Sequence, residues 1–266
     1  MKLTDNTKIL VSDFDFTIME HGYPDITAMN LQAIKRWRSK GNLSVIASGR
    51  SLPGLESEMK NFREYADFLI LNDGATIIHA DKEKVYSDRI ESQLIDDFKD
   101  ALLNLHLRGK YATISYYGER ELDRIQPGCC KFRLWFEHAD DCRAVKTLID
   151  ERFNKKFQSI MYLDVIFNHD TRLDWIDGSL QNTLEVNRKG TDKKTALDRL
   201  LTTICVNNPK DKVIAIGDDS NDLSMLEAYN GYTLYHANEE VIRRIPQYHV
   251  VTHLYQLIAN QMKALA

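Results

Sequence analysis

Short apolar runs alternate with amphipathic stretches in the first part of the chain. Three of these runs are short and rich in large or β-branched residues, and they predict β-strands at residues 8–11, 43–47 and 68–71. Between the first two, Leu31, Ile34 and Trp37 recur at helical spacing, with a candidate N-cap at Thr27 and a helix stop at Gly41. This alternation predicts β-α units and a parallel sheet.

The middle of the chain has a different pattern, in which predicted strands outnumber predicted helices. A turn at residues 72–75 is followed by predicted strands at 76–79, 84–87, 111–117, 131–136, 160–168 and 173–176, and by helices at 93–107 and 140–153. This composition favours an inserted α+β module with an antiparallel sheet.

The alternation of strands and helices resumes near Thr191. A helix is predicted through Leu200, then strands at 213–216 and 232–234 and helices after Asp219 and from Tyr255. The two ends of the chain therefore form one domain. We predict an α/β fold with a Rossmann-like parallel-sheet core domain of residues 1–75 and 184–266, and an inserted α+β cap domain of residues 76–183.

Composition and charge exclude several classes of partner. The formal net charge of −4 supplies no broad positive field for nucleic acid, and no segment has the apolar length of a membrane span. The four cysteines, Cys129, Cys130, Cys142 and Cys205, form neither a zinc motif nor a disulfide framework. We therefore expect free thiols, a cytoplasmic location, and a monomer or weak homodimer with no nucleic-acid or membrane partner.

Two carboxylates, Asp13 and Asp15, stand where the first predicted strand ends. Ligands of open parallel sheets bind beyond the carboxyl ends of the strands, and two fixed carboxylates can divide nucleophilic and proton-transfer roles. An Asp-x-Asp pair alone is more typical of an acidic turn or of part of a calcium loop than of a catalytic site.

A denser acidic cluster follows the strand at 213–216. Three carboxylates and one amide lie within five positions, at Asp218, Asp219, Asn221 and Asp222. Since so much negative charge repels itself, a divalent cation is the expected partner. Helix capping by Asp218 or Asp219 would require only one carboxylate and is compatible with a metal.

Three further positions could hold phosphate oxygens. Ser48 and Gly49 follow the second strand, where a hydroxyl and backbone N–H groups are available. Lys193 precedes a helix and could neutralise both a phosphate and a carboxylate. Taken singly, the Ser-Gly pair is more typical of an ordinary turn, and Lys193 is more typical of a surface charge.

In order along the chain, these segments resemble the four motifs of the haloacid dehalogenase (HAD) superfamily, namely Asp13-x-Asp15-x-Thr17, Ser48, Lys193 and Gly217-Asp218-Asp219-x-Asn221-Asp222. The insertion, Ser48-Gly49-Arg50 and the Asn-Asp-Gly-Ala turn resemble the Cof-type phosphatase branch with its large cap. The resemblance implies a catalytic core domain, a cap that closes over the site and reads the substrate, and a Mg²⁺-dependent phosphatase of small phosphorylated metabolites. Sugar phosphates are the preferred class, before pyridoxal phosphate or a nucleotide.

The same resemblance implies roles for individual residues. Asp13 would attack phosphorus to form an aspartyl-phosphate, and Asp15 would protonate the leaving group and then activate water. The Asp13 carboxylate, the Asp15 backbone carbonyl and Asp218 would hold Mg²⁺, while Asp222 would act through water or by orienting Lys193. The phosphoryl oxygens would be bound by Ser48, Gly49, Lys193 and Asn221.

Some positions depart from the Cof-type pattern. Phe16 and Lys194 stand where Gly is usual, and His236-Ala237-Asn238 where Gly-Asn-Ala is common. Phe16 could narrow the entrance to the site, and Lys194 leaves two candidates for the phosphate-binding lysine, of which the register favours Lys193.

Two alternatives to a phosphatase remain open. A phosphomutase of the same superfamily would share Asp13 and Asp15, and a non-catalytic phosphate-ester sensor could retain the fold. Asp15 favours turnover over a sensor, because a pure phosphate acceptor needs no second carboxylate. His21 lies in the loop after the first motif without an assigned role, and the sequence does not select specificity residues among Tyr116, Tyr117, Arg133 and Trp175.

Overall fold

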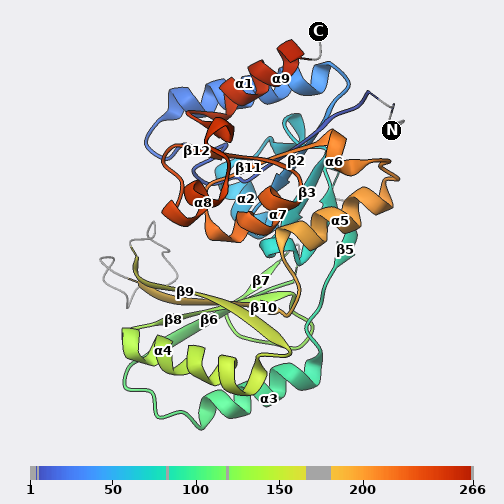
Figure 1. Cartoon of the computed structure of the whole chain (residues 1–266). Helices are drawn as coiled ribbons and strands as arrows, with labels where there is room; N and C mark the ends of the chain where they lie inside the picture. The colour runs from blue at the N-terminus through green and yellow to red at the C-terminus, as the bar shows by residue number, and fades with distance from the viewer. Residues whose placement is uncertain (1–3, 5, 82–83, 118–119, 166–180, 265–266) are drawn as a thin grey trace. The chain divides into compact units, whose positions relative to one another are not determined.

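The computed structural model describes residues 4, 6–81, 84–117, 120–165 and 181–264 (Figure 1). The chain divides into two compact units. One comprises Met1–Arg50, Gly54–Tyr86 and Asp192–Ala266, and the other comprises Ser51–Pro53 and Ser87–Thr191. Among the described helices, none combines the length and the apolar character needed to cross a bilayer.

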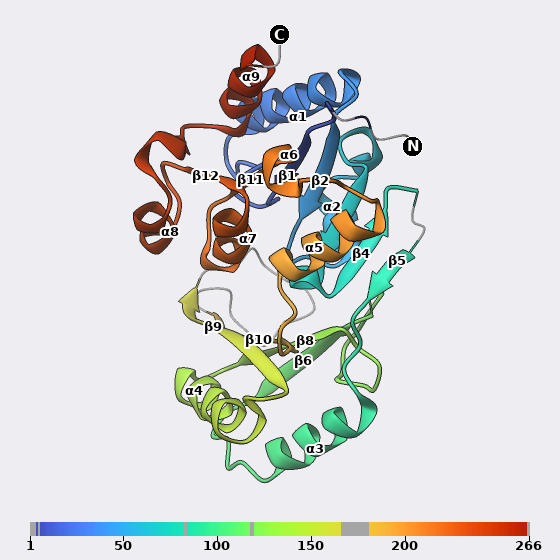
Figure 2. The same cartoon turned by 45° about the vertical axis from the view of Figure 1, so that its right-hand side comes forward.

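The first unit is built on an eight-stranded sheet of order β13-β12-β11-β1-β2-β3-β4-β5 (Figure 2). Its strands are β1 (Ile9–Ser12), β2 (Leu43–Ala47), β3 (Phe68–Leu71), β4 (Thr76–His79), β5 (Lys84–Ser87), β11 (Val213–Gly217), β12 (Asn230–Leu234) and β13 (Val250–Val251). The pairs from β13 through β3 are parallel, and β4 pairs antiparallel with β3. The prediction of a Rossmann-like parallel-sheet core is confirmed.

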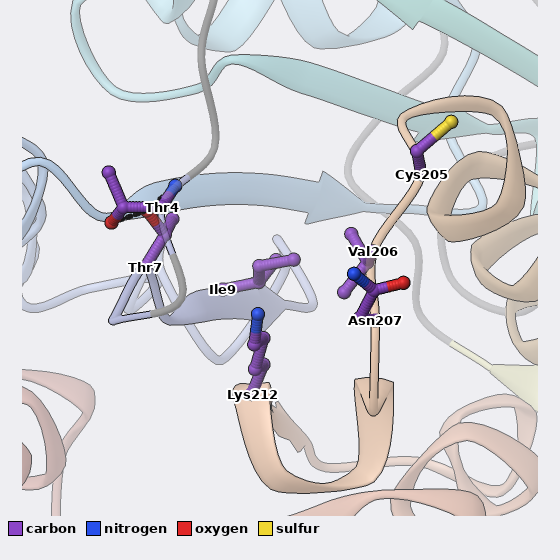
Figure 3. Close-up of a pocket in the computed structure, with 7 residues that line it drawn as sticks. All are labelled: Thr4, Thr7, Ile9, Cys205, Val206, Asn207 and Lys212. Atoms are coloured by element: carbon purple, nitrogen blue, oxygen red, sulfur yellow. Dashed lines mark hydrogen bonds between the residues drawn. The ribbon is translucent and has the colours of Figure 1, made fainter.

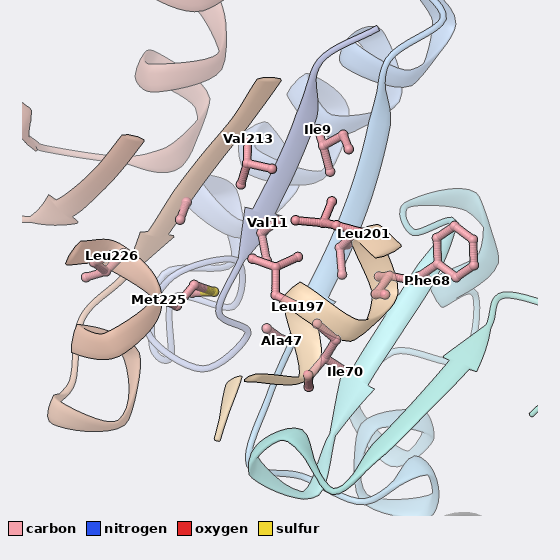
Figure 4. Packing of buried hydrophobic residues seen from close by; sticks show 14 of the residues in the cluster. Ile9, Val11, Ala47, Phe68, Ile70, Leu197, Leu201, Val213, Met225 and Leu226 are labelled. Atoms are coloured by element: carbon pink, nitrogen blue, oxygen red, sulfur yellow. The ribbon is translucent and has the colours of Figure 1, made fainter. Parts of the chain in front are cut away.

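Helices of the first unit cover this sheet with apolar side chains. The helices that lie wholly or mostly in this unit are α1 (Pro24–Ser39), α2 (Leu52–Glu58), α5 (Lys193–Thr203), α6 (Pro209–Lys212), α7 (Leu223–Ala228), α8 (Glu239–Arg244) and α9 (Leu254–Ala264), and all but the short α6 bury apolar side chains. In one buried cluster, Ile9 and Val11 of β1 pack with Leu197 and Leu201 of α5 (Figure 4). Because side chains alternate across a strand, every second residue of β1 contributes to this cluster.

The start of the first helix differs from the sequence prediction. Thr27 lies inside α1, which begins at Pro24, because proline fits the first helical position where its missing N–H costs no hydrogen bond. The hydroxyl of Thr27 instead accepts a hydrogen bond from the backbone N–H of Glu20. Gly41 follows the end of α1 with φ +82°, as predicted for a helix stop.

The second unit contains a five-stranded antiparallel sheet of order β7-β6-β8-β10-β9. Its elements are α3 (Ser92–Leu103), β6 (Tyr111–Tyr116), β7 (Glu121–Leu122), β8 (Lys131–Phe136), α4 (Ala139–Leu148), β9 (Phe157–Val165) and β10 (Gln181–Arg188). Alternate residues of the sheet, such as Phe132 and Leu184, pack with Phe98 of α3 and Val145 of α4. This unit therefore has an α+β core of its own.

The extent of the insertion differs from the predicted residues 76–183. Strands β4 and β5 belong to the larger sheet, because the chain reverses after β3 and β4 pairs with it at once. Strand β10 has only two apolar residues, Leu184 and Val186, alternating with polar ones, and the sequence reading missed it. The compact units separate at Tyr86/Ser87 and Thr191/Asp192. The strand predicted at 173–176 lies outside the described residues.

Candidate active site

The predicted motifs meet at one edge of the eight-stranded sheet. Strand β1 pairs in parallel with both β11 and β2, and Ser12 at its end lies opposite Ile216 and Ile46. The backbone N–H of Asp13 donates to the carbonyl of Ile216 at 2.9 Å, so that the nucleophile candidate is tied to the neighbouring strand. Residues that follow β1, β2 and β11 therefore share the carboxyl edge of the sheet.

Lys193, the first residue of α5, joins the first and fourth motifs. Its ammonium lies 2.5 Å from Oδ1 of Asp13 and 2.7 Å from Oδ1 of Asp222, and its side chain is only 1% exposed. Burial alone would lower the pKa of Lys193, but the charges of both carboxylates outweigh it and raise the pKa well above its ordinary value. Lys193 is therefore a fixed positive charge beside Asp13.

The side chain of Lys194 lies at the partly exposed surface of the same helix, away from Asp13. Its ammonium pairs with Asp198 one turn along the helix, at 2.6 Å, and both side chains are more than a third exposed. The structure thus brings Lys193, and not Lys194, to Asp13.

Asp222 organises the turn that follows β11. Its Oδ2 accepts hydrogen bonds from the backbone N–H groups of Asp218 and Asp219 at 3.1 and 3.2 Å, while Oδ1 accepts from Lys193. A Cβ at Gly217 would stand 2.3 Å from Cγ of Asp222, which requires glycine there. The Asp219 carboxylate caps the following turn through Ser220 N–H at 2.7 Å.

Carboxylate oxygens of Asp13, Asp218 and Asp222 lie within 4.8 Å of one another. Burial, reinforced by the charge of the other two carboxylates, raises the pKa of Asp13 against the opposing charge of Lys193. Burial and then the charge of Asp222 raise the pKa of Asp218 to about 7. A cluster of oxygen ligands with excess negative charge fits a hard divalent cation such as Mg²⁺.

Asp15 lies in a different set of contacts. Arg50 forms a fork on its carboxylate, with Nε 2.7 Å from Oδ2 and Nη2 2.8 Å from Oδ1, and Nε2 of His21 lies 2.9 Å from Oδ1. Burial alone would raise the pKa of Asp15, but the hydrogen bonds and charge of Arg50, and then those of His21, lower it below its ordinary value. Asp15 is therefore held as a carboxylate.

The predicted phosphate-binding residues after β2 lie close to an aspartate that sequence reasoning missed. The hydroxyl of Ser48 accepts the N–H of Arg50 at 3.1 Å. A Cβ at Gly49 would stand 2.9 Å from Oδ1 of Asp73, the same atom that accepts from the amide of Asn221 at 3.2 Å. Asp73 has φ +54° in the tight turn after β3, and its sequence signal was a turn at a strand end. Gly49 and Asn221 therefore converge on Asp73.

His21 is a second residue that the sequence did not assign, because nothing in a loop pattern shows where its ring will point. Arg50 appeared only as part of the Cof-type pattern, and its fork on Asp15 also depends on the fold. A cavity of about 50 Å³ lies away from these residues (Figure 3). It is lined by Ile9 at the start of β1, at the opposite end of that strand from Asp13, and by Thr4, Thr7, Cys205, Val206, Asn207 and Lys212.

Comparison with known proteins identifies the family. Residues 10–249 match the sequence model of the haloacid dehalogenase-like hydrolases. A protein of Buchnera aphidicola, provisionally named a phosphatase, is 25% identical over 228 residues, covering 82% of each chain. A haloacid dehalogenase-like hydrolase from Bacteroides thetaiotaomicron superposes with TM-score 0.71 at 20% identity, over 96% of this chain and 99% of that one.

A second structure from Bacteroides thetaiotaomicron, studied among phosphatases of the HAD superfamily, superposes with TM-score 0.70 at 18% identity, over 100% of this chain and 97% of that one. Likeness at this level of identity shows the shared fold. The match of the family's sequence model over residues 10–249 places the protein: the chain belongs to the haloacid dehalogenase-like hydrolases.

Proposed function

We propose that this protein is a Mg²⁺-dependent phosphatase that hydrolyses small phosphorylated metabolites through an aspartyl-phosphate on Asp13. The observation that carries the proposal is the buried contact between Asp13 and Lys193, beside the carboxylates of Asp218 and Asp222. A fixed ammonium keeps part of the negative charge of this cluster neutralised, so that a phosphate dianion can approach a carboxylate nucleophile.

In the first half of the reaction, an Asp13 carboxylate oxygen attacks phosphorus and the bond from phosphorus to the ester oxygen breaks. Asp15 gives a proton to that departing oxygen. The pKa of Asp15 is low in the structure, and the negative charge of a bound phosphate would raise it toward the value that a proton donor needs. Lys193 would stabilise the charge that spreads over the phosphoryl oxygens.

In the second half, water attacks phosphorus of the aspartyl-phosphate. Asp15, now a carboxylate, takes a proton from that water, and the bond between phosphorus and Asp13 breaks to release inorganic phosphate. Ser48, the backbone N–H of Gly49 and Asn221 would bind phosphoryl oxygens in both halves. Gly49 and Asn221 both lie against the Asp73 carboxylate. For the phosphate to bind there, the Asp73 side chain would have to move, or the amide of Asn221 would have to donate to the phosphate instead of to Asp73.

The residues present fit a divalent cation. Asp13, Asp218 and the backbone carbonyl of Asp15 would hold it, and Asp222 would act by fixing Lys193 and the turn at Asp218. When bound, Mg²⁺ supplies charge neutralisation for the phosphoryl group. The raised pKa of Asp218 supports this assignment, because burial and the charge of Asp222 outweigh the positive charge of Lys193 and leave the cluster with excess negative charge.

We propose sugar phosphates as the preferred substrates, with the inserted unit acting as the cap that sets specificity. The relation to the Cof-type branch supports this preference. Residues 87–191 have their own antiparallel sheet and helical layer, as a separate specificity module would require.

The test is release of inorganic phosphate from sugar phosphates, pyridoxal phosphate, nucleotides and p-nitrophenyl phosphate, with Mg²⁺ or EDTA. We expect Mg²⁺-dependent release that Asp13→Asn abolishes, together with an acid-stable, hydroxylamine-sensitive phosphoryl group on the wild type. No release from any ester by folded, Mg²⁺-loaded protein would exclude the phosphatase. Interconversion of two sugar phosphates without net release would indicate a phosphomutase instead.

A further inference from the structure

His21 lies outside the four motifs, yet its ring reaches the second aspartate of the first one. The guanidinium of Arg50 donates to both oxygens of Asp15, in the fork that a carboxylate accepts, so Nε2 of His21 carries the hydrogen and donates it to Oδ1. The side chain of His21 is a quarter exposed and that of Asp15 less than a third, so the contact lies partly out of solvent.

The two carboxylate oxygens of Asp15 accept different numbers of hydrogen bonds from Arg50 and His21. Arg50 gives one hydrogen bond to each oxygen, which fixes the plane of the carboxylate. His21 adds a second donor to Oδ1 alone. Oδ2 therefore keeps more free lone-pair capacity than Oδ1 and is the oxygen better able to hold a proton.

The position of the His21 ring is itself supported by an unusual backbone. Phe16 has φ +56° and its ring packs on His21, with centroids 4.9 Å apart and planes at 60°. The Phe16 N–H donates to the Met19 carbonyl at 2.8 Å, and Nε2 of His236 donates to the Phe16 carbonyl at 3.0 Å. A left-handed non-glycine residue persists only where its surroundings fix it, as these two hydrogen bonds do here.

We infer that His21 is a positioning residue for proton transfer: by donating to Oδ1 of Asp15, it leaves Oδ2 as the oxygen that gives and takes the proton. Phe16 serves this arrangement by holding the imidazole ring. The inference rests on the proposed phosphatase function, and it assigns a role to two residues that stand outside the reacting groups.

The experiment compares two leaving groups in matched variants. His21→Phe keeps an aromatic ring against Phe16 and deletes the donor, whereas His21→Gln restores an N–H at similar reach. An alkyl phosphate, the best sugar phosphate of the panel, needs a proton on its leaving oxygen. p-Nitrophenyl phosphate does not, because its phenolate is a good leaving group. The readout is kcat/KM, which reports on the steps through the first phosphoryl transfer.

We expect His21→Phe to lower kcat/KM for the alkyl ester roughly 10-fold, a part of the 10²–10⁴-fold that general acid–base catalysis supplies. The kcat/KM for p-nitrophenyl phosphate should change less than about 2-fold, because cleavage of that ester depends little on a proton donor. His21→Gln should recover most of the loss. His21→Asn, whose amide is one methylene shorter than that of glutamine, replaces His21→Phe if that variant does not fold.

Equal losses for both esters, no loss for either, or no recovery by His21→Gln in a folded protein would overturn the inference. Those outcomes leave the phosphatase function standing, because the wild type is active in all of them. A wild type inactive toward every ester would instead remove the proposed function, and the role of His21 with it.

Discussion

The hydroxyl of Thr17 donates a hydrogen bond to Oδ1 of Asp218 across 3.0 Å, although 201 positions separate the two residues. Thr17 lies in the loop after β1 and Asp218 directly after β11, and these strands are parallel neighbours. Thr17 is fully buried while Asp218 is partly exposed, so the hydrogen bond is partly shielded from water. The contact joins the loop that follows Asp13 to the acidic cluster and fixes the orientation of one candidate metal ligand.

Replacing Thr17 by valine should therefore weaken metal binding. Valine matches threonine in shape but cannot donate, so that Asp218 loses its orienting partner. Loss of a group that orients a metal ligand typically costs 10–100-fold in affinity, and we expect the Mg²⁺ concentration for half-maximal activity to rise roughly 10-fold. Thr17→Ser keeps the hydroxyl and is the control. The same half-saturating concentration in both variants would show that the hydrogen bond has no such role.

The segments that form the parallel strands and the acidic positions that follow them could be predicted from the sequence, because both depend on local pattern. Short apolar runs form the parallel strands, and carboxylates that follow them, such as Asp13 and Asp218, must share the carboxyl edge once the strands pair. The contact of His21 with Asp15 could not be predicted. It depends on a left-handed backbone at Phe16, which local propensity disfavours.

The end of the insertion escaped prediction for a related reason. Strand β10 reads as mostly polar, and its strand conformation comes from pairing with β8 and β9 on both sides, which no local pattern shows.

The two adjacent lysines should differ sharply when each is replaced by methionine. Lys193→Met removes the only charge that the structure shows bonded to both Asp13 and Asp222, and leaves two buried carboxylates facing each other. Removing one partner of a buried pair costs about 3–5 kcal/mol, so we expect the free energy of unfolding in urea with EDTA to fall by about that amount. Phosphatase activity should be lost as well.

Lys194→Met is the matched control, because it removes an exposed pair with Asp198 at the next position. Such i,i+4 pairs contribute about 0.3–0.5 kcal/mol, and activity should be retained. Equal destabilisation by the two substitutions would contradict the assignment of Lys193 as the buried counter-charge.

The stability of the metal-free protein should fall as the pH rises toward the pKa of Asp218 in the acidic cluster. The pKa of Asp218 is raised from 3.8 to about 7, so the folded state holds a proton that the unfolded state has released. The stability that Asp218 contributes is thus complete below the unfolded pKa and is lost as pH approaches 7. We expect Mg²⁺ to take the place of that proton, so the increase in Tm on adding Mg²⁺ should be larger at pH 8 than at pH 5.5.

Asp218→Asn removes the titrating carboxyl of Asp218, so it separates the contribution of Asp218 to the pH dependence of Tm from the contributions of other titrating groups. The variant should show a flatter decline of Tm between pH 5.5 and 8 in EDTA, and little gain from Mg²⁺ at either pH. A wild-type Tm gain that is equal at both pH values would refute the raised pKa as the source of the metal's stabilising effect.

Substitutions at Phe16 can measure the strain held beside the site. Phe16 is 50% exposed, and its φ of +56° is a conformation that glycine adopts freely and other residues do not. Phe16→Ala and Phe16→Gly both remove the ring from His21, and they differ in whether a Cβ remains in the left-handed backbone. The left-handed conformation costs an L-residue roughly 1–2 kcal/mol, so we expect Phe16→Gly to be more stable than Phe16→Ala by about 1 kcal/mol in urea unfolding.

In a position with ordinary backbone angles the order reverses, because glycine loses more conformational entropy on folding. The sign of the difference therefore tests the backbone directly, and a more stable alanine variant would show that the turn relaxes once the aromatic ring is gone.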